Sequence, residues 1–338
     1  MAINVAINGF GRIGRMAFRV MLEKPEVNVV AINDLAEADA LAYLLKYDSV
    51  QRRLEAEVSA SENSITVDGT TYPVFTEKDP AALPWKDLDV DVVIESTGVF
   101  RKKEQMQLHI DAGAKTVVLS APGKSDGIET VVQGVNDQTY DKSNVHVSSA
   151  SCTTNCIAPV MAVLEREFGV EKAMMTTIHG YTGDQNLVDG PHKDFRRGRS
   201  AAVNIVPTTT GAALATGKTI PALADTFDGM AIRVPVPDGS CSDITALLKK
   251  DVTVEEVNAA FKAAVQDEHF GRIMAVSEDA IVSTDIIGRT ESSIVDLPFT
   301  KVVAGNLVKV LAWYDNEMGY SHRLVEQAIQ AGELVKNS

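Results

Sequence analysis

The chain has 338 residues, and at about 150 residues per domain this length favours two domains, each with its own core. Hydrophobic residues make up 45% and charged residues 23% of the sequence, which excludes a disordered or low-complexity chain. Because 46 Asp and Glu outnumber 32 Lys and Arg, giving a net charge of −14, we expect no binding to nucleic acid or to an anionic membrane.

Cysteine usage and hydropathy together predict a cytoplasmic protein. Three cysteines are too few for a disulfide scaffold, which indicates a reducing compartment. No apolar run approaches the ~18 residues that a bilayer-spanning helix needs, and the N-terminus lacks the charged and apolar segments of a secretion signal.

The first part of the chain alternates short β-branched runs with helical patterns. Buried strands are predicted at Ile3–Ile7, Val27–Ile32, Val90–Ile94 and Thr116–Leu119. An amphipathic helix is predicted at Ile13–Leu22, and a hairpin with its turn at Asp68-Gly69 is predicted within Ser59–Tyr72. This alternation is typical of the α/β class, with a Rossmann-type, doubly wound parallel sheet.

After Ser151 the pattern changes. A helix at Cys152–Phe168 and a strand at Ala173–Ile178 are predicted, followed by a Gly-, Asp- and Arg-rich segment at His179–Arg199. We predict a first domain at residues 1–150 and an α+β domain with a mixed or antiparallel sheet at residues 151–316. A C-terminal helix at about residues 317–338 is expected to pack back on the first domain.

A glycine pattern follows the first predicted strand. Gly9, Gly11 and Gly14 form G-x-G-x-x-G, which by itself marks only a tight strand-to-helix turn. In this context the glycines let a pyrophosphate approach the helix N-terminus, whose N–H groups favour an anion. Asp34 closes the second strand about 20 residues later, where a carboxylate binds an adenosine ribose, although a helix-capping Asp is the alternative. A carboxylate there favours NAD over NADP, so residues 1–150 are predicted to form an NAD-binding domain.

Two later strand ends carry small polar residues. Thr97 lies in Ser96-Thr97-Gly98 and Ser120 in Ser120-Ala121-Pro122, at the sheet edge where nucleotides bind in such folds. Taken alone these segments are ordinary turns. With the glycine pattern in place, Thr97 and Ser120 become candidates for the nicotinamide side of the site.

Cys152 is the candidate nucleophile. The small residues before it cap a predicted helix, so the thiol lies in the first turn, where the helix dipole is expected to lower its pKa. Cys156, one turn further on, is interpreted as a small buried hydrophobe. No metal site is expected, because the Cys-x-x-x-Cys spacing has no companion pair.

Candidate partners of the thiol are spread through the second half. His179 leads the histidines because it ends a predicted strand, although a lone His is more often a packed or surface residue. Arg197, in a basic stretch, could bind a phosphate with two hydrogen bonds or lie in a solvated loop or subunit contact. Arg233 stands in an apolar strand and requires a partner there.

Four segments resemble the signatures of phosphorylating glyceraldehyde-3-phosphate dehydrogenases. They are Asn8-Gly9-Phe10-Gly11-Arg12-Ile13-Gly14-Arg15, Leu44-Leu45-Lys46-Tyr47-Asp48-Ser49, Ala150-Ser151-Cys152-Thr153-Thr154-Asn155-Cys156 and Trp313-Tyr314-Asp315-Asn316-Glu317. The cysteine segment is highly specific. The resemblance implies oxidation and phosphorylation of D-glyceraldehyde 3-phosphate to 1,3-bisphosphoglycerate with reduction of NAD, in glycolysis or gluconeogenesis.

The same resemblance implies roles for individual residues and a homotetramer with an S-shaped loop at about Tyr181 to Val203. Cys152 would be the nucleophile and His179 the acid–base group. The attacking phosphate would be held by Ser151, Thr153, Thr210 and Gly211, and the substrate phosphate by Thr182, Arg197 and Arg233. The family's dinucleotide contacts correspond to Arg12, Ile13, Asp34, Lys78, Ser120 and Asn316.

Several positions depart from the commonest family pattern. Gly180 stands where Ser is usual, Leu214 where Lys is usual, and Val236-Pro237-Asp238-Gly239-Ser240 replaces Thr-Pro-Asn-Val-Ser. Gly190-Pro191 replaces the Leu-Pro of many NAD-specific members, which leaves dual use of NAD and NADP open. An erythrose-4-phosphate dehydrogenase and a catalytically silent dinucleotide-binding scaffold are the alternative functions.

Overall fold

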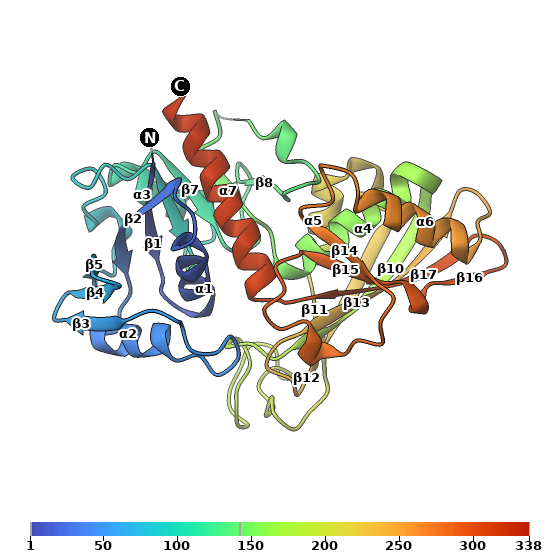
Figure 1. Ribbon diagram of the computed structural model, residues 1–338, viewed down its shortest axis with the longest axis horizontal. Helices are drawn as coiled ribbons and strands as arrows, with labels where there is room; N and C mark the ends of the chain where they lie inside the picture. Colours follow the sequence, from blue (N-terminus) through green and yellow to red (C-terminus); the bar gives the residue numbers. More distant parts are fainter. Residues whose placement is uncertain (1, 142, 338) are drawn as a thin grey trace. The chain divides into compact units, whose positions relative to one another are not determined.

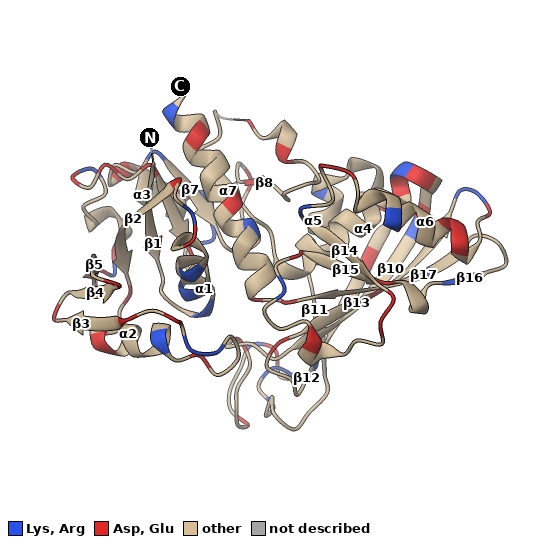
Figure 2. Cartoon of the chain, viewed as in Figure 1, with Lys and Arg blue, Asp and Glu red and all other residues tan. Residues whose placement is uncertain are grey.

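The computed structural model describes residues 2–141 and 143–337, and the chain divides into two compact units. Unit 1 comprises Met1–Val131, Thr139–Ala150 and Ser321–Ser338, and unit 2 comprises Val132–Gln138 and Ser151–Tyr320. Charged residues are distributed along both units rather than gathered in one segment (Figure 2). Within the described residues, no helix is both long and apolar enough to cross a bilayer.

Unit 1 is built on a sheet with the strand order β3-β4-β5-β2-β1-β6-β7-β9-β8 (Figure 1). Its strands are β1 (Ile3–Asn8), β2 (Val27–Asn33), β3 (Val58–Ser61), β4 (Ser64–Val67), β5 (Thr70–Phe75), β6 (Val92–Glu95), β7 (Thr116–Leu119), β8 (Glu129–Thr130) and β9 (His146–Ser148). All neighbours from β5 to β8 in this order are parallel, whereas β3, β4 and β5 pair antiparallel. The prediction of a doubly wound parallel sheet is confirmed.

The apolar strands of unit 1 are buried on both faces because helices and loops cover them. The helices are α1 (Arg12–Met21), α2 (Ala38–Lys46), α3 (Lys103–Asp111) and the C-terminal α7 (Met318–Lys336), with short 3-10 turns η1 (Pro80–Ala82) and η2 (Asp137–Thr139). From Ser321 onward α7 belongs to unit 1, where a Cβ on Gly332 would lie only 2.3 Å from Ile3. The predicted hairpin is a three-strand meander, and Asp68 and Gly69 form its second turn with positive φ angles of 46° and 82°.

Unit 2 contains a mixed sheet in the order β11-β12-β10-β13-β17-β15-β14, with β16 paired to β17. Its strands are β10 (Val170–Gly180), β11 (Val206–Thr209), β12 (Phe227–Val234), β13 (Ser240–Leu248), β14 (Met274–Ser277), β15 (Ser293–Asp296), β16 (Lys301–Val303) and β17 (Leu307–Tyr314). Its helices are α4 (Cys152–Phe168), α5 (Ala212–Thr219) and α6 (Val254–Ala264), with 3-10 turns η3 (Pro221–Leu223), η4 (Ser283–Asp285) and η5 (Leu297–Phe299). Because β10 is parallel to β12 but antiparallel to β13, the prediction of an α+β unit with a mixed sheet is confirmed.

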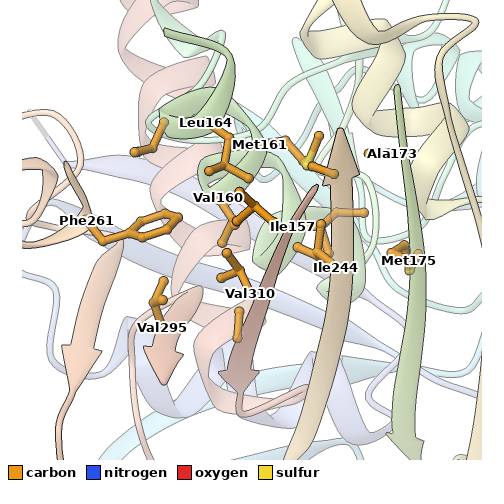
Figure 3. Close-up of a cluster of buried hydrophobic side chains, with 14 of the residues drawn as sticks. Ile157, Val160, Met161, Leu164, Ala173, Met175, Ile244, Phe261, Val295 and Val310 are labelled. Atoms are coloured by element: carbon orange, nitrogen blue, oxygen red, sulfur yellow. The ribbon is translucent and has the colours of Figure 1, made fainter. Parts of the chain in front are cut away.

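The helices α4, α5 and α6 lie together on one face of this sheet (Figure 1). Figure 3 shows Ile157, Val160 and Leu164 of α4 in the core with Ile244 and Val310 of the central strands. Burial of these side chains, worth about 1.5–3 kcal/mol each, anchors α4 along the sheet and thereby sets the position of its first residue.

Candidate active site

The carboxyl ends of four parallel strands meet at one edge of the unit 1 sheet. Asn8 of β1 pairs with Asn33 of β2 and Glu95 of β6, and Glu95 pairs with Leu119 of β7. The residues that follow these strands therefore lie along one edge. They include the sequence-predicted Gly9, Asp34, Thr97 and Ser120.

Two glycines of the G-x-G-x-x-G loop differ in the space around their Cβ positions. A Cβ on Gly14 would lie 2.1 Å from the carbonyl oxygen of Gly9, so no larger residue fits without moving the backbone. Gly11, the N-cap of α1, has no atom within 4 Å of its Cβ position and no side-chain cap bond. The open space therefore lies at the helix N-terminus, where N–H groups favour an anion such as a pyrophosphate.

Asp34 is held next to this loop. Its Oδ2 accepts a hydrogen bond from the Phe10 N–H at 2.7 Å, and its Oδ1 accepts one from Ala36 at 3.0 Å. Lys78 is exposed in the loop after β5, the strand that pairs with β2, and so belongs to the same edge. A carboxylate with remaining acceptor capacity beside an anion-binding turn fits the ribose and pyrophosphate of a dinucleotide.

Arg12 and Ile13 follow Gly11 in the first turn of α1, and both residues are half-buried. The Arg12 guanidinium forms two hydrogen bonds with the buried Asp48 carboxylate, at 2.6 and 3.2 Å. These bonds, with two backbone N–H donors, hold the pKa of Asp48 below its usual range despite its burial. The Arg12 side chain is thus already paired with Asp48.

A buried polar network beneath the edge was not predicted from the sequence. Glu95 Oε1 accepts hydrogen bonds from the Thr97 N–H and hydroxyl at 2.9 and 2.5 Å, and Oε2 accepts one from Asn8 Nδ2 at 2.6 Å. Because Trp85 Nε1 donates to His109 Nδ1 at 3.0 Å, the His109 proton lies on Nε2, 3.2 Å from Glu95 Oε2. Polar residues at two strand ends, Asn8 and Glu95, were the available signal.

In unit 2, Cys152 is the first residue of α4. The Ser151 hydroxyl caps this helix by accepting the Thr154 N–H at 3.1 Å. Cys152 is a half-buried residue, and its Sγ lies 3.4 Å from Nε2 of His179, the penultimate residue of β10. The structure therefore brings together the predicted nucleophile and the predicted acid–base group.

The expected lowering of the Cys152 pKa is wrong for this geometry. Burial raises the pKa of the thiol above its usual range, and the charge of Arg233 with hydrogen bonds from Thr153 opposes this increase without cancelling it. The sequence indicated the helix N-terminus but not the desolvation that packing imposes on the sulfur. Burial also raises the pKa of Cys156 and that of Cys241, the latter to about 12. Charges and hydrogen bonds offset these increases less than they offset the increase at Cys152.

Arg233 lies beside His179 because β10 and β12 are parallel and these two residues are in register. Arg233 Nη1 is 2.6 Å from His179 Nδ1 and 2.9 Å from the carbonyl oxygen of Gly180. Burial and the Arg233 charge lower the pKa of His179 to about 3, so the imidazole is neutral near pH 7. Nδ1 also lies 2.7 Å from Gly180 O, and when it donates there Nε2 is an acceptor directed at the thiol.

Tyr314 was given no role from the sequence, yet it joins the same cluster. Its hydroxyl lies 2.9 Å from Thr153 Oγ1 and 2.8 Å from Thr177 Oγ1, and its ring meets that of His179 edge-on at 6.0 Å. Burial raises the pKa of Tyr314 well above its usual value, so the phenol is protonated. The alternation of buried residues along β17, which ends at Tyr314, could have indicated this inward position.

The predicted phosphate ligands differ in what they offer. Arg197 bonds Thr208 Oγ1 at 2.9 Å and Thr209 O at 3.0 Å and is paired with Asp184, while its charge also lowers the pKa of His179. A phosphate would therefore compete with Asp184 for this guanidinium. Gly211 caps α5 with no atom near its Cβ position, and Ser151, Thr153, Thr182 and Thr210 are hydroxyl residues of unit 2 near helix or strand ends.

Asn316, the predicted dinucleotide contact in unit 2, is buried after β17. Its Oδ1 accepts a hydrogen bond from Ser240 Oγ at 2.5 Å, and Ser240 in turn accepts the Gly180 N–H at 3.1 Å. The position of Asn316 is thus tied to the strand end that carries His179. Among the described residues, no group of three or more His, Cys, Asp or Glu has the arrangement of a metal site.

Two family profiles match the chain. "Glyceraldehyde 3-phosphate dehydrogenase, NAD binding domain" matches residues 3–103, and "Glyceraldehyde 3-phosphate dehydrogenase, C-terminal domain" matches residues 151–316. The chain belongs to the glyceraldehyde-3-phosphate dehydrogenase family. Similar proteins of that name occur in Streptomyces coelicolor, at 53% identity over 98% of this chain and 99% of the relative, and in Geobacillus stearothermophilus, at 54% over 97% and 98%. A third, glyceraldehyde-3-phosphate dehydrogenase 1 of Bacillus subtilis, is 51% identical over 97% and 98%.

Membership of the glyceraldehyde-3-phosphate dehydrogenase family confirms the predicted resemblance and the prediction of an NAD-dependent dehydrogenase. The NAD-binding profile covers the glycine loop, Asp34, Lys78 and Thr97, and the C-terminal profile covers the Cys152–His179 pair. The roles of these individual residues remain predictions and are taken up next.

Proposed function

We propose that this protein oxidises D-glyceraldehyde 3-phosphate to 1,3-bisphosphoglycerate, using NAD and inorganic phosphate, through a covalent bond to Cys152. The carrying observation is the 3.4 Å separation of Cys152 Sγ and His179 Nε2 at the N-terminus of α4, in a chain of this family. A thiol beside a neutral imidazole is the arrangement that nucleophilic catalysis by cysteine requires.

In the oxidative half, Cys152 Sγ bonds to the aldehyde carbon, and the thiol proton reaches the aldehyde oxygen by way of His179 Nε2. The product of this addition is a hemithioacetal. NAD supplies the oxidant, accepting the hydride of that carbon at C4 of its nicotinamide. As the hydride leaves, His179 Nε2 takes the hydroxyl proton, and the carbon remains on Cys152 as a thioester.

In the second half, a phosphate oxygen attacks the thioester carbon, and the carbon–sulfur bond breaks. The sulfur leaves as a thiolate and recovers a proton from His179, which restores the neutral pair. Backbone N–H groups at the start of α4 are oriented to stabilise the oxyanion of both steps, a contribution of about 3 kcal/mol for each well-placed donor. Conservation of the oxidation energy in the thioester is what permits formation of an acyl phosphate.

The phosphate groups require cations and donors around this pair. Arg233 Nη1 donates to the Gly180 carbonyl oxygen, the group that His179 Nδ1 also faces, and its charge adds positive potential at the thiol. We assign Thr182, Arg197 and Arg233 to the substrate phosphate, and Ser151, Thr153, Thr210 and Gly211 to the attacking phosphate. Displacement of Asp184 from Arg197 by the substrate phosphate would exchange one anionic partner for another.

For the cofactor, the fit lies in unit 1. Gly9, Gly11 and Gly14, with the backbone of Arg12 and Ile13, would hold the pyrophosphate, and Asp34 with Lys78 the adenosine end. Thr97 and Ser120, together with Asn316, would bind the nicotinamide end. Asp34 already accepts two backbone N–H groups, so it stays fixed and would repel the 2′-phosphate of NADP.

Assembly as a homotetramer, in the cytoplasm, is part of the proposal. The face of the unit 2 sheet opposite α4 exposes Met174 (68%) and Met230 (41%), and the segment after His179 exposes Phe195 (89%). Clustered exposed apolar side chains are typical of subunit contacts. Sedimentation of the wild type is expected to give a tetramer, and Met174→Glu to give smaller species, whereas a monomeric wild type would contradict this part.

An assay of NADH absorbance tests the activity. NADH should form from NAD and glyceraldehyde 3-phosphate only with phosphate present, with a higher kcat/KM than for erythrose 4-phosphate and a strong preference over NADP. Limiting iodoacetate should alkylate Cys152 before the buried Cys156 and Cys241, with activity lost in step. Preferential labelling of Cys241 with parallel inactivation would overturn the assignment, and no NADH formation would indicate a silent scaffold.

A further inference from the structure

Two carboxyl groups outside the thiol–imidazole pair lie buried against each other in unit 2. Asp238 and Asp315 are each 1% exposed, and their side chains are hydrogen-bonded to one another. Asp238 stands in the turn before β13, and Asp315 follows β17, so the antiparallel pairing of these two strands brings together residues that are 77 positions apart in the sequence. Two carboxyl oxygens bond to each other only when one of them carries a proton.

The backbone contacts indicate which carboxyl holds that proton. Asp315 accepts three N–H groups on its two oxygens, from Gly288 at 2.7 Å, Glu317 at 2.8 Å and Met318 at 2.6 Å. A carboxylate with both oxygens so occupied is the acceptor of the pair. Asp238 Oδ1 accepts the Gly239 and Asn316 N–H groups at 2.8 and 3.2 Å, and burial together with the neighbouring carboxyl groups favours the shared proton on Asp238.

The charges around Asp238 all favour its neutral form. Burial, the carboxyl of Asp315 and the charge of Glu317 raise the pKa of Asp238 to about 9. In the neighbouring segment Arg289 is paired with Glu291, at 2.6 and 3.0 Å. On α4 the titratable group that interacts with Asp238 is the Cys152 thiol, because a charged Asp238 raises the pKa of that thiol.

Asp238 also holds Asn316. The Asp238 Oδ1 accepts the Asn316 N–H at 3.2 Å, and the Asn316 side chain is bonded to Ser240 Oγ, two residues after Asp238. The turn itself cannot shift easily, because Gly239 has a φ of +84° and a Cβ there would lie 2.2 Å from the Ser283 carbonyl oxygen. Repulsion within the pair would therefore displace the Asp315–Asn316 side.

We propose that Asp238 and Asp315 form an acid–carboxylate pair that positions Asn316, and that loss of the shared proton at alkaline pH weakens binding of the nicotinamide end of NAD. The second clause rests on the proposed role of Asn316. Asp238 is then a positioning residue, since it acts through Asn316 and does not touch the substrate. The loss of its proton also places a negative charge where it disfavours the Cys152 thiolate.

Asp238→Asn is the decisive variant, because the amide keeps the Oδ1 acceptor and replaces the acid O–H by an N–H donor without a titratable proton. NAD affinity, measured by calorimetry from about pH 7 to about pH 10, should fall up to about tenfold per pH unit above the transition in the wild type and stay nearly level in the variant. Asp243→Asn is the matched control, since Asp243 lies on β13, the strand that follows Asp238, and pairs with Lys309 at 2.6 Å. It should titrate as the wild type does.

Unfolding by urea across pH gives a second readout that needs no cofactor. The folded-state pKa of Asp238 is above its unfolded value, so the native state binds a proton that the unfolded chain lacks, and stability falls as pH rises from about 4 to about 9. Asp238→Asn removes this pH dependence. The free energy of unfolding of the variant, relative to that of the wild type, should therefore increase across that pH range. Asp315→Asn should let Asp238 ionise at lower pH and move the wild-type loss of NAD affinity in the same direction.

The two measurements distinguish the shared proton of Asp238 and Asp315 from its effect on NAD binding. Equal pH dependence of unfolding in the wild type and Asp238→Asn overturns the shared proton. A changed unfolding slope with unchanged NAD affinity across pH overturns the link to Asn316. Failure of the wild type to bind NAD at any pH contradicts the proposed function, while the unfolding data still decide the pair.

Discussion

The two units hold their candidate site residues in different ways. In unit 1, Gly9, Asp34, Thr97 and Ser120 each follow a parallel strand, so the edge of the sheet aligns them and much of the binding falls to backbone N–H groups. In unit 2, the cluster is made of side chains from different elements that meet only through sheet register and helix packing. We therefore expect substitutions in the unit 2 cluster to abolish catalysis, and substitutions at the unit 1 sheet edge to weaken coenzyme binding by degrees.

The largest effect is expected from Cys152→Ser, because the weaker nucleophile cannot form the thioester. Activity should fall by about 10⁴-fold or more, while NAD binding, assigned to unit 1, stays near the wild-type value. Steady-state NADH formation and calorimetry measure the two quantities. Cys241→Ser, a change of the same kind in the buried thiol of β13, should retain activity, and an equal loss there would remove the distinction between the units.

Next comes His179→Asn, which removes the group that moves the proton. We expect kcat to fall by about 10²- to 10⁴-fold with little change in NAD affinity, and iodoacetate should alkylate Cys152 more slowly near neutral pH. The control is His269→Asn, at a histidine of unit 2 that contacts Phe270 instead of the thiol. A near-wild-type kcat at every pH would contradict the assignment of His179 as the acid–base group.

A graded effect is expected in unit 1 from Asp34→Ala. Loss of hydrogen bonds to a charged acceptor should weaken NAD by about 10- to 100-fold, and relief of repulsion should leave NADP less affected or improved. Calorimetry with both coenzymes measures the change, with Asp39→Ala on the exposed side of α2 as control. Equal use of NAD and NADP by the unmodified protein would show that Asp34 does not dominate the pocket.

The smallest effect should follow Tyr314→Phe, which keeps the edge-on ring contact with His179 but removes the hydroxyl bonds to Thr153 and Thr177. One or two kcal/mol of lost positioning corresponds to a fall in kcat of about 5- to 30-fold. Pre-steady-state NADH formation measures it, with Tyr43→Phe on α2 as control. A loss as large as that of His179→Asn would mean that the phenol itself takes part in proton transfer.

Features that depend on near neighbours in the chain could be predicted without the structure. Runs of β-branched residues mark β1, β2, β6 and β7, because strands buried on both faces of a parallel sheet are continuously apolar. The small residues at Ser151 cap α4 locally, and the glycine spacing allows one particular turn. The class of fold, the family and Cys152 at a helix N-terminus were therefore all predictable.

The electrostatics and the contact partners of the site residues depend on how distant segments pack. The register of β10 with β12 sets Arg233 against His179 Nδ1, and neither sequence separation nor periodicity specifies that contact. The same holds for the carboxyl pair of Asp238 and Asp315, and for the raised pKa of Cys152, where burial outweighs the helix dipole. A pKa depends on every charge and on the solvent excluded around a group, and the chain supplies those surroundings only after distant segments have packed.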